Sequence, residues 1–273
     1  MVSLGWKIFI AGAVIPCIVV ILVGAYLMTD LPKDDGDDAI VQKDFVFADQ
    51  DFTLDIRLGD VEGFPQGWFR TLGPEANGKR FVTPDDPTIV KLWSVIGPMM
   101  GGMTDLEKAK SLLRFVQDAT YYEYDIYAFG MRDYVQYPAE TLYRGFGDCE
   151  DVSYLLYTLY AKAGLDAVIL STSDHVSVGV NVEGAVGNGY KRLLSDDIYY
   201  IAEATGSSSI GRATLDGSVP WVFKPTDGFS VFLITAGTAV IVLVSVLTLN
   251  MRNEGTAIQA RRAQEVSPDA QGL

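Results

Sequence analysis

Two apolar runs without a charged residue bracket most of this chain, and they limit its possible folds more than any other feature. The first run covers residues 8–28, and the second extends from about Phe229 to Leu249. Each is about 20 residues long, which is the length an α-helix needs to cross the hydrocarbon core of a bilayer. We therefore expect transmembrane helices at 8–28 and 228–250, with the residues between them in one compartment.

The charges flanking the two runs predict their orientation. Aspartates are frequent after the first run, in residues 30–38, and arginines follow the second run after residue 251. Cytoplasmic flanks are usually the ones rich in lysine and arginine. We expect a two-pass protein of the cell membrane, with residues 1–7 and a disordered tail, 251–273, in the cytoplasm. A cleaved signal peptide is the alternative for the first run, although no Ala-x-Ala pattern ends it.

The composition restricts the chemistry available outside the membrane. The net charge of −14 provides no basic footprint, so we expect no nucleic-acid partner. One of the two cysteines, Cys17, lies within the first apolar run, so no disulfide framework is expected and Cys149 is a free thiol. Any chemistry that needs a histidine must use His175, because the chain has no other.

The residues between the two runs indicate one extracytoplasmic domain, 44–226, joined to the first run by an acidic tether, 29–43. Alternation of apolar and polar residues over Phe45–Leu58 indicates a strand or hairpin arm, and glycines and prolines indicate a loop up to Pro84. Apolar stripes at helical spacing follow. They predict helices over residues 86–96, 104–120 and 150–163.

Short strands are expected after these helices. The apolar run 167–170, the alternating stretch 175–180 and the run 199–203 are each typical of a strand. In the second of these, His175 is predicted to share a small, open face with Ser177 and Gly179. Helices that precede an antiparallel sheet in the chain predict an α+β domain.

Cys149 is expected in the first turn of its helix, where several effects act on the thiol. The exposed N–H groups and the positive end of the helix dipole favour a thiolate there, and the same N–H groups can stabilise an oxyanion. The carboxylates of Asp148, Glu150 and Asp151 oppose the thiolate, each effect being on the order of 1 kcal/mol. We expect these effects roughly to cancel, so that the thiol needs His175 as its base.

A histidine base works best when a third group orients the ring. Glu203 is the first candidate because it ends the strand after the long loop. Asp174 is a candidate because it is adjacent to His175, but it ranks second because neighbouring residues in a strand normally point to opposite faces. Gln136 and Tyr137 are candidates for a second oxyanion donor. The alternative to a catalytic role is a structural one for each of these residues, and Cys149 would then be a small buried apolar residue.

Four short motifs resemble the transglutaminase-like superfamily over about residues 86–206. They are Tyr137-Pro-Ala-Glu-Thr-Leu142, Gly147-Asp-Cys-Glu-Asp151, Asp174-His-Val176 and Glu203-Ala-Thr205. The resemblance implies a papain-like Cys-His-Asp triad in that chain order, in a fold of helices packed on an antiparallel sheet. This chain has Glu203 where an aspartate is usual. Calcium-dependent proteases of the superfamily carry a similar Asp-Cys-Glu-Asp, so the resemblance leaves calcium near Asp148 or Asp151 as an alternative, although we expect no cofactor.

These observations predict a membrane-anchored thiol enzyme of transglutaminase-like type, a cysteine peptidase or amidase that acts through a thioester acyl-enzyme. The expected partners are membrane lipid and a protein or peptide substrate at the cell surface. Three alternatives stay open: an amine in place of water as acyl acceptor, a catalytically inactive module for binding or envelope structure, and a sensory ectodomain. The sequence does not determine the oligomeric state.

Overall fold

The computed structural model describes residues 39–225, apart from residues 63, 65–69, 71–77, 194 and 216–217. All of these residues belong to one compact unit, Asp30–Gly228. The predicted transmembrane segments at 8–28 and 228–250, and both predicted tails, lie outside the described residues. Within the described part of the chain, no helix is both long enough and apolar enough to cross a bilayer.

An antiparallel hairpin opens the described part of the chain. Strands β1 (Ile40–Phe47) and β2 (Gln50–Arg57) pair over their whole length. Two phenylalanines of β1 pack against Phe115, so the inner side of the hairpin joins the core. The hairpin arm expected from Phe45 onward is present. It begins five residues earlier than expected, within the predicted tether 29–43.

Helices follow the hairpin, and side-chain caps precede the first residues of α4 and α5. Asp86 accepts a hydrogen bond of 2.9 Å from the backbone N–H of Thr88, and Thr104 forms a capping box with Glu107. The bounds are α2 (Leu58–Glu62), the 3-10 turn η2 (Gly78–Phe81), α4 (Pro87–Met99), α5 (Asp105–Ala119), α6 (Asp125–Ala128), α7 (Pro138–Arg144) and α8 (Cys149–Lys162). The three predicted helices correspond to α4, α5 and α8.

The sheet at the C-terminal end of the domain is antiparallel throughout, with the strand order β7-β8-β6-β5-β9. Its strands are β5 (Asp166–Ser171), β6 (Val176–Asn181), β7 (Gly189–Lys191), β8 (Ile198–Ala202) and β9 (Trp221–Phe223). A separate parallel pair joins β3 (Tyr121–Tyr122) to β4 (Phe146–Gly147). The three predicted strands correspond to β5, β6 and β8, and the α+β prediction is confirmed.

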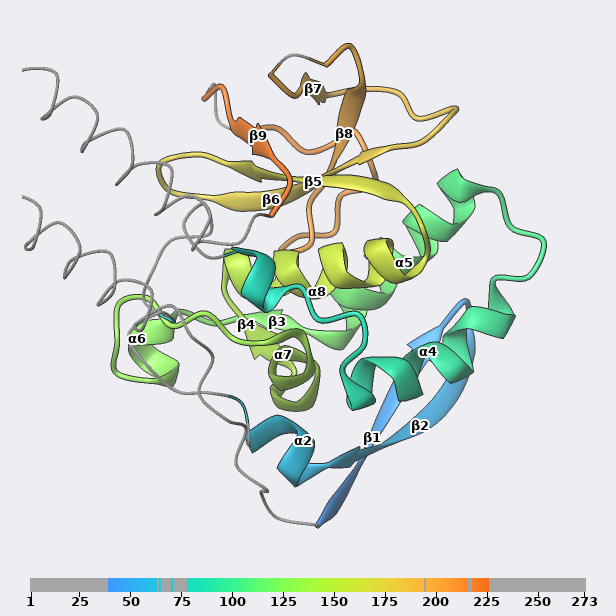
Figure 1. The fold of residues 1–273 in the computed structure, drawn as a ribbon, viewed down its shortest axis with the longest axis vertical. Coiled ribbons are helices and arrows are strands. Elements are labelled where there is room, and N and C mark those ends of the chain that lie inside the picture. Colours follow the sequence, from blue (N-terminus) through green and yellow to red (C-terminus); the bar gives the residue numbers. More distant parts are fainter. Residues whose placement is uncertain are drawn as a thin grey trace, which may run out of the picture. The chain divides into compact units, whose positions relative to one another are not determined.

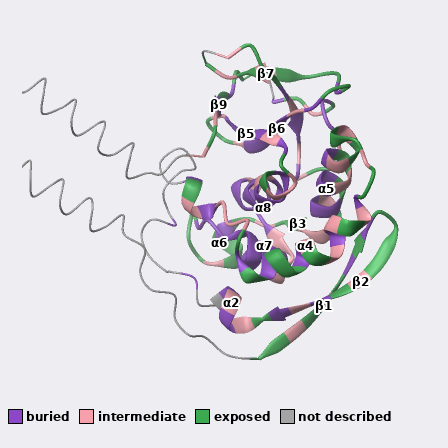
Figure 2. Cartoon of the chain, turned by 45° about the vertical axis from the view of Figure 1, so that its right-hand side comes forward, coloured by how far each residue is buried: buried purple, intermediate pink, exposed green. Residues whose placement is uncertain are grey.

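Helix α8 lies against one face of the sheet, where it contacts β5 and β6 (Figure 1). The three valines of β6 share one core cluster with the leucines of α8, and a smaller cluster covers the opposite face of the sheet. Figure 2 shows α8 as a largely buried helix between the sheet and the other helices. Its first turn is therefore held firmly beside the first residues of β6.

The prediction that His175 shares an open face with Ser177 and Gly179 is wrong. Ser177 is fully buried, and a Cβ added at Gly179 would lie 2.9 Å from atoms of both Tyr199 and Val168. That face is closed because the second core cluster packs on it. His175 itself precedes β6, so the alternation of the strand does not determine where its ring points.

Candidate functional site

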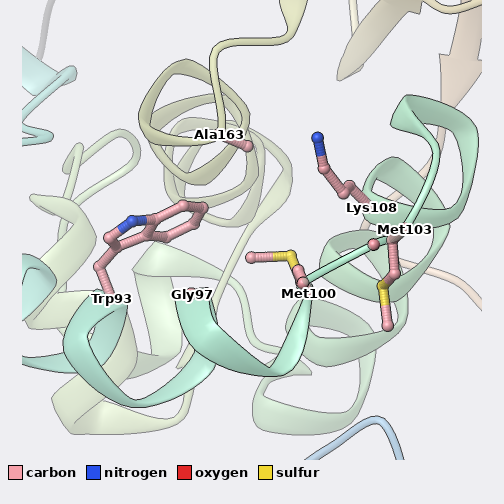
Figure 3. Close-up of a pocket in the computed structure, with 8 residues that line it drawn as sticks. Trp93, Gly97, Met100, Met103, Lys108 and Ala163 are labelled. Atoms are coloured by element: carbon pink, nitrogen blue, oxygen red, sulfur yellow. The ribbon is translucent and has the colours of Figure 1, made fainter.

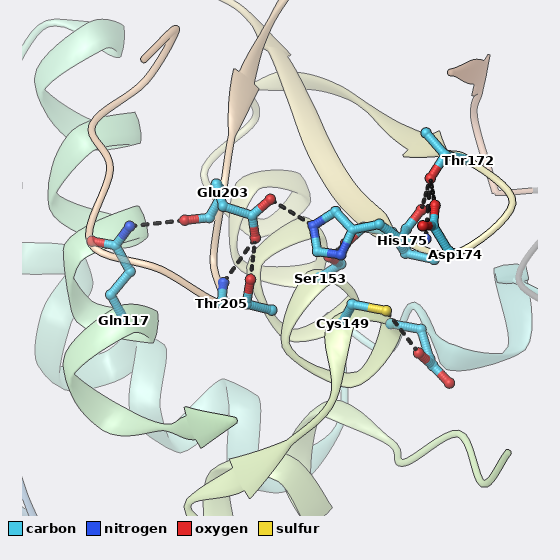
Figure 4. Close-up of polar contacts among 10 residues, drawn as sticks. Gln117, Cys149, Ser153, Thr172, Asp174, His175, Glu203 and Thr205 are labelled. Atoms are coloured by element: carbon cyan, nitrogen blue, oxygen red, sulfur yellow. Dashed lines mark hydrogen bonds and ion pairs between the residues drawn. The ribbon is translucent and has the colours of Figure 1, made fainter. Parts of the chain in front are cut away.

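Cys149 is the first residue of α8, and its sulfur lies beside the beginning of β6 (Figure 4). The backbone N–H of Val176 donates a hydrogen bond to the sulfur. One helical turn further, the Ser153 hydroxyl donates to the Val176 carbonyl at 3.1 Å. These two contacts join the helix to the strand next to His175, and the cysteine remains partly exposed.

A glycine before the cysteine makes this tight approach possible. A Cβ added at Gly147 would lie 2.6 Å from the Cβ of Asp151, closer than real Cβ atoms come to one another. The same glycine pairs with Tyr122 in the short ladder of β3 and β4. Steric fit therefore explains the glycine of the Gly-Asp-Cys-Glu-Asp motif.

Glu203 orients the histidine ring from the end of β8. The distance between His175 Nε2 and Glu203 Oε2 is 2.7 Å. The other carboxylate oxygen of Glu203 accepts hydrogen bonds from the Thr205 hydroxyl at 2.6 Å and from the Thr205 backbone N–H at 3.0 Å. The Gln117 side chain donates to the Glu203 carbonyl at 2.8 Å, which fixes the backbone as well.

The hydrogen bonds to Glu203 determine which nitrogen of the ring carries the proton. Burial raises the pKa of Glu203, but the hydrogen bonds from His175 and Thr205 outweigh it and lower the pKa below its ordinary value. Glu203 is therefore an ionised acceptor, and Nε2 of the neutral ring is the donor. Nδ1 is then the nitrogen that can accept a proton from a thiol.

Cys149 and His175 line a single pocket with a volume of about 380 Å³. Its walls come from the segment before α7, the first turn of α8, and the turn between β5 and β6. The remaining lining residues are Tyr122, Tyr124, Asp133, Val135, Asp148, Glu150, Ser171, Thr172, Ser173, Asp174 and Val176. The histidine backbone is held in this turn by Thr172, whose hydroxyl accepts from the His175 N–H at 3.1 Å.

The raised pKa of Cys149 keeps the thiol neutral, whereas we expected the helix dipole and the neighbouring carboxylates to have nearly equal and opposite effects on that pKa. Burial raises the pKa of Cys149 well above its ordinary value, and the charges of Glu150 and Asp148 raise it further. The thiol also donates a hydrogen bond of 3.3 Å to Glu150 Oε2, which stabilises the protonated form. The expectation that the dipole and the carboxylates cancel is wrong, because it omitted the desolvation of the sulfur.

Three buried aspartates gather below the cysteine. One oxygen from each of Asp125, Asp148 and Asp151 lies within 4.8 Å of the others. Burial, followed by repulsion from the neighbouring carboxylates, raises the pKa of all three, that of Asp125 to about 7. Burial of several carboxyl groups at such short range is costly unless protons or a cation neutralise them.

The residues present fit a hard divalent cation. Within the described part of the chain, the buried Asp148 Oδ1 accepts no hydrogen bond, and neither does the amide oxygen of Gln136, whose side chain contacts Asp151. Carboxylate and amide oxygens are the ligands that calcium prefers. Asp148 and Asp151 were the candidates predicted from the sequence. Asp125 was not predicted, because it comes from α6, 23 residues before Asp148, and no spacing signal joins the two.

The two predicted oxyanion donors do not line the pocket. Both hydrogens of the buried Gln136 amide are used, in bonds to Asp151 at 2.6 Å and to the Phe146 carbonyl at 3.1 Å. Tyr137 is also buried and stacks on Phe64, with the ring centroids 4.1 Å apart. Both side chains belong to the core, because the segment that carries them turns inward before α7.

Asp174 lines the pocket but accepts its hydrogen bond of 3.1 Å from Thr172, while Glu203 is the partner seen at the histidine ring. Tyr122 also lines the pocket. Burial raises the pKa of Tyr122, and the neighbouring Cys149 contributes to the shift, so the phenol lies near the sulfur.

A second cavity, of about 310 Å³, lies at the C-terminal end of α4 (Figure 3). It is lined mainly by Trp93, two methionines and glycines, with Lys108 at one side. That lysine forms an ion pair of 3.0 Å with Asp105. None of the lining residues is a nucleophile with an adjacent base, so the Cys149 pocket is the better candidate for catalysis.

Comparisons with known proteins leave the family of this chain open. No protein-family model matches the sequence, and no curated protein matches it. Among solved structures, a similar chain is a protein from Cytophaga hutchinsonii provisionally described as a cysteine protease. The two chains are 12% identical, the match covers 68% of this chain and 71% of that chain, and the TM-score is 0.29. A TM-score this low does not establish a shared fold or activity.

Proposed function

We propose that this chain is a membrane-anchored, extracytoplasmic thiol hydrolase, a cysteine peptidase or amidase of transglutaminase-like type. The observation that carries the proposal is the 2.7 Å hydrogen bond between His175 Nε2 and Glu203, on a ring that shares one pocket with the Cys149 thiol. A nucleophile, a base and a group that orients the base are the parts of a catalytic triad.

Because the thiol is neutral, its proton leaves as the sulfur attacks. His175 Nδ1 accepts the proton while the bond forms between Cys149 Sγ and the carbonyl carbon of a peptide or carboxamide. Glu203 stabilises the resulting imidazolium through Nε2. The imidazolium then gives its proton to the leaving amine as the C–N bond breaks, and the product is a thioester.

Hydrolysis of the thioester reverses these roles. Water attacks the thioester carbon, His175 accepts a proton from it, and the sulfur leaves and is protonated again. The backbone N–H groups in the first turn of α8 are the proposed donors to the oxyanion in both steps, since they point toward the N-terminal end of the helix where Cys149 lies.

Calcium is the proposed cofactor, with Asp125, Asp148 and Asp151 as the residues that would hold it. When bound, the ion supplies positive charge that offsets the carboxylates around the sulfur and lowers the pKa of the thiol. Glu150 contacts the sulfur directly, so its charge is among those that the ion would offset.

The proposed localisation rests on the two charge-free runs at 8–28 and 228–250 and on the arginines after the second. A domain held at the membrane at both of its ends acts on substrates close to that surface. A protein or peptide of the cell surface is therefore the proposed substrate, with water as the acceptor.

One observation favours a second function, a binding module without catalysis. The Cys149 thiol donates to Glu150 and its pKa is raised, which is the opposite of the state a thiolate nucleophile needs. A domain that had lost catalysis would keep the pocket and the fold while its thiol stayed protonated.

The test is acylation of the full-length chain by a p-nitrophenyl ester, followed by intact-mass and peptide mass spectrometry. Replacing Cys17 with alanine leaves Cys149 as the only thiol. We expect one acyl group, on Cys149, with release of p-nitrophenol that is abolished in Cys149→Ala and slowed by at least about a hundredfold in His175→Ala.

Ser94→Ala is the matched control, because it removes an exposed hydroxyl from α4, a helix that contributes no described residue to the Cys149 pocket. It should retain most of the acylation rate. Acylation at other residues, or equal rates in the parent and His175→Ala, would favour the binding module.

A further inference from the structure

Three exposed tyrosines form a row that begins in the Cys149 pocket. Tyr122, Tyr124 and Tyr127 are 41%, 57% and 78% exposed. Their rings meet edge to face, with centroids 5.0 Å apart for the first pair and 6.1 Å for the second. We call these residues the tyrosine row. Tyr122 and Tyr124 line the pocket, so the row continues its wall outward over α6.

The same pocket is strongly acidic. Its lining includes the carboxylates of Asp133, Glu150 and Asp174 besides the buried Asp148, and neither lysine nor arginine is among the described residues that line it. A cleft lined by one sign of charge concentrates ligands of the opposite sign. The pocket is therefore built to attract a cation into the space next to the nucleophile.

Asp148 adds a separate indication of a ligand. Its side chain is only 9% exposed, and its Oδ1 atom accepts no hydrogen bond although it is buried. A buried acceptor without a donor costs free energy unless a ligand supplies the donor. An ammonium or guanidinium group has several N–H donors for such an oxygen, so a cationic side chain and the proposed calcium ion are alternative ligands of Asp148.

We infer that this pocket recognises a lysine or arginine side chain of a polypeptide substrate, close to the carbonyl that Cys149 attacks. The carboxylates bind the charge, and the tyrosine row offers aromatic faces to the cation and to the apolar stem of the side chain. The inference rests on the proposed function and adds to it the class of substrate.

The acidic lining also decides between the two roles that a lysine can have. Neighbouring carboxylates favour the charged form of an amine and raise its pKa. An amine held in this pocket stays protonated, and a protonated amine cannot attack a thioester. The cation therefore serves recognition, and water remains the acyl acceptor.

Binding to an inactive protein tests the inference apart from catalysis. We would titrate full-length Cys149→Ala by calorimetry with three pentapeptides, Ala-Ala-X-Ala-Ala, in which X is lysine, the uncharged norleucine or glutamate. The lysine peptide should bind about tenfold more tightly than the norleucine peptide, and the glutamate peptide more weakly than either. Equal affinities for lysine and norleucine would overturn the inference.

Two substitutions locate the binding surface. Asp133→Asn and Tyr124→Leu should each reduce the preference for lysine by about threefold. Asp196→Asn is the control, because it removes the same charge from an exposed position between β7 and β8 and should leave the preference unchanged. If the control lost as much of the preference for lysine as Asp133→Asn, the net charge of the protein would explain the preference, and the inference would be overturned.

Calcium distinguishes a peptide site from a metal site. Binding of calcium alone, with the three peptides bound equally, would assign the acidic pocket to the metal and overturn the inference. The proposed function fails by a different result, the absence of an acyl group on Cys149, so the two failures can be told apart.

Discussion

Replacing Glu150 with glutamine is expected to lower the pKa of the Cys149 thiol, because the carboxylate both repels a thiolate and accepts a hydrogen bond from the protonated thiol. The distance between Sγ and Oε2 is 3.3 Å, and Glu150 is only 9% exposed. At an effective dielectric constant of about 20, two unit charges at that distance interact with about 5 kcal/mol, which is an upper limit.

Asp148 reduces this effect. Its raised pKa depends partly on a hydrogen bond to Glu150 and on the charge of Glu150. When that charge is removed, Asp148 ionises more readily and its own charge repels the thiolate. We therefore expect Glu150→Gln to lower the thiol pKa by about 1 to 2 units, well below the limit of between three and four units that about 5 kcal/mol corresponds to.

The assay is the pH dependence of Cys149 alkylation by iodoacetamide, with Cys17 replaced by alanine. The midpoint of the rate profile reports the thiol pKa. Glu183→Gln is the matched control, since it removes the same charge from an exposed loop. A midpoint in Glu150→Gln that stays within about 0.3 units of the parent, or rises, would refute the reasoning.

Three further predictions concern stability and rate. Burial raises the pKa of Asp125 to about 7 from an ordinary 3.8, so the stability that its protonated form contributes is present below about pH 4 and is lost as the pH rises through 7. The free energy of unfolding should therefore fall over this range, and Asp125→Asn should remove on the order of 2 to 4 kcal/mol of the fall, as measured by thermal unfolding at several pH values. Arg70→Met removes the ion-pair partner that lies 2.7 Å from the buried Glu140 carboxylate, and it should lower the free energy of unfolding in urea by about 3–5 kcal/mol. Adding Glu140→Leu should restore part of this loss, and a loss below about 1 kcal/mol would contradict the prediction. Thr205→Val removes a donor from Glu203 and should slow acylation of Cys149 roughly threefold to tenfold, whereas Thr205→Ser should not.

Features with a local cause were predictable from the sequence. Helices α5 and α8 were expected because each carries its apolar stripe within one short segment. The partnership of His175 and Glu203 was expected if the strands that carry them are antiparallel neighbours, and β6 and β8 do pair, although the short strand β7 lies between them in the chain.

Features that depend on contacts between distant segments were not predictable. Asp125 reaches the other two aspartates only because β3 pairs with β4 and carries α6 along with it. Gln136 is a polar residue among others, and its burial follows from the inward turn of the chain and its bonds to Asp151. The raised pKa of Cys149 also depends on burial, which a sequence does not display.

The central claim is that Cys149, His175 and Glu203 act as one unit, and the single histidine of the chain makes a direct measurement possible. In the full-length protein with ¹⁵N-labelled histidine and no histidine tag, NMR reports the two ring nitrogens of His175 alone. The account predicts a neutral ring protonated at Nε2, with an Nδ1 resonance that moves when Cys149 is replaced by alanine. A ring protonated at Nδ1, or an Nδ1 resonance identical in the two proteins, would contradict it.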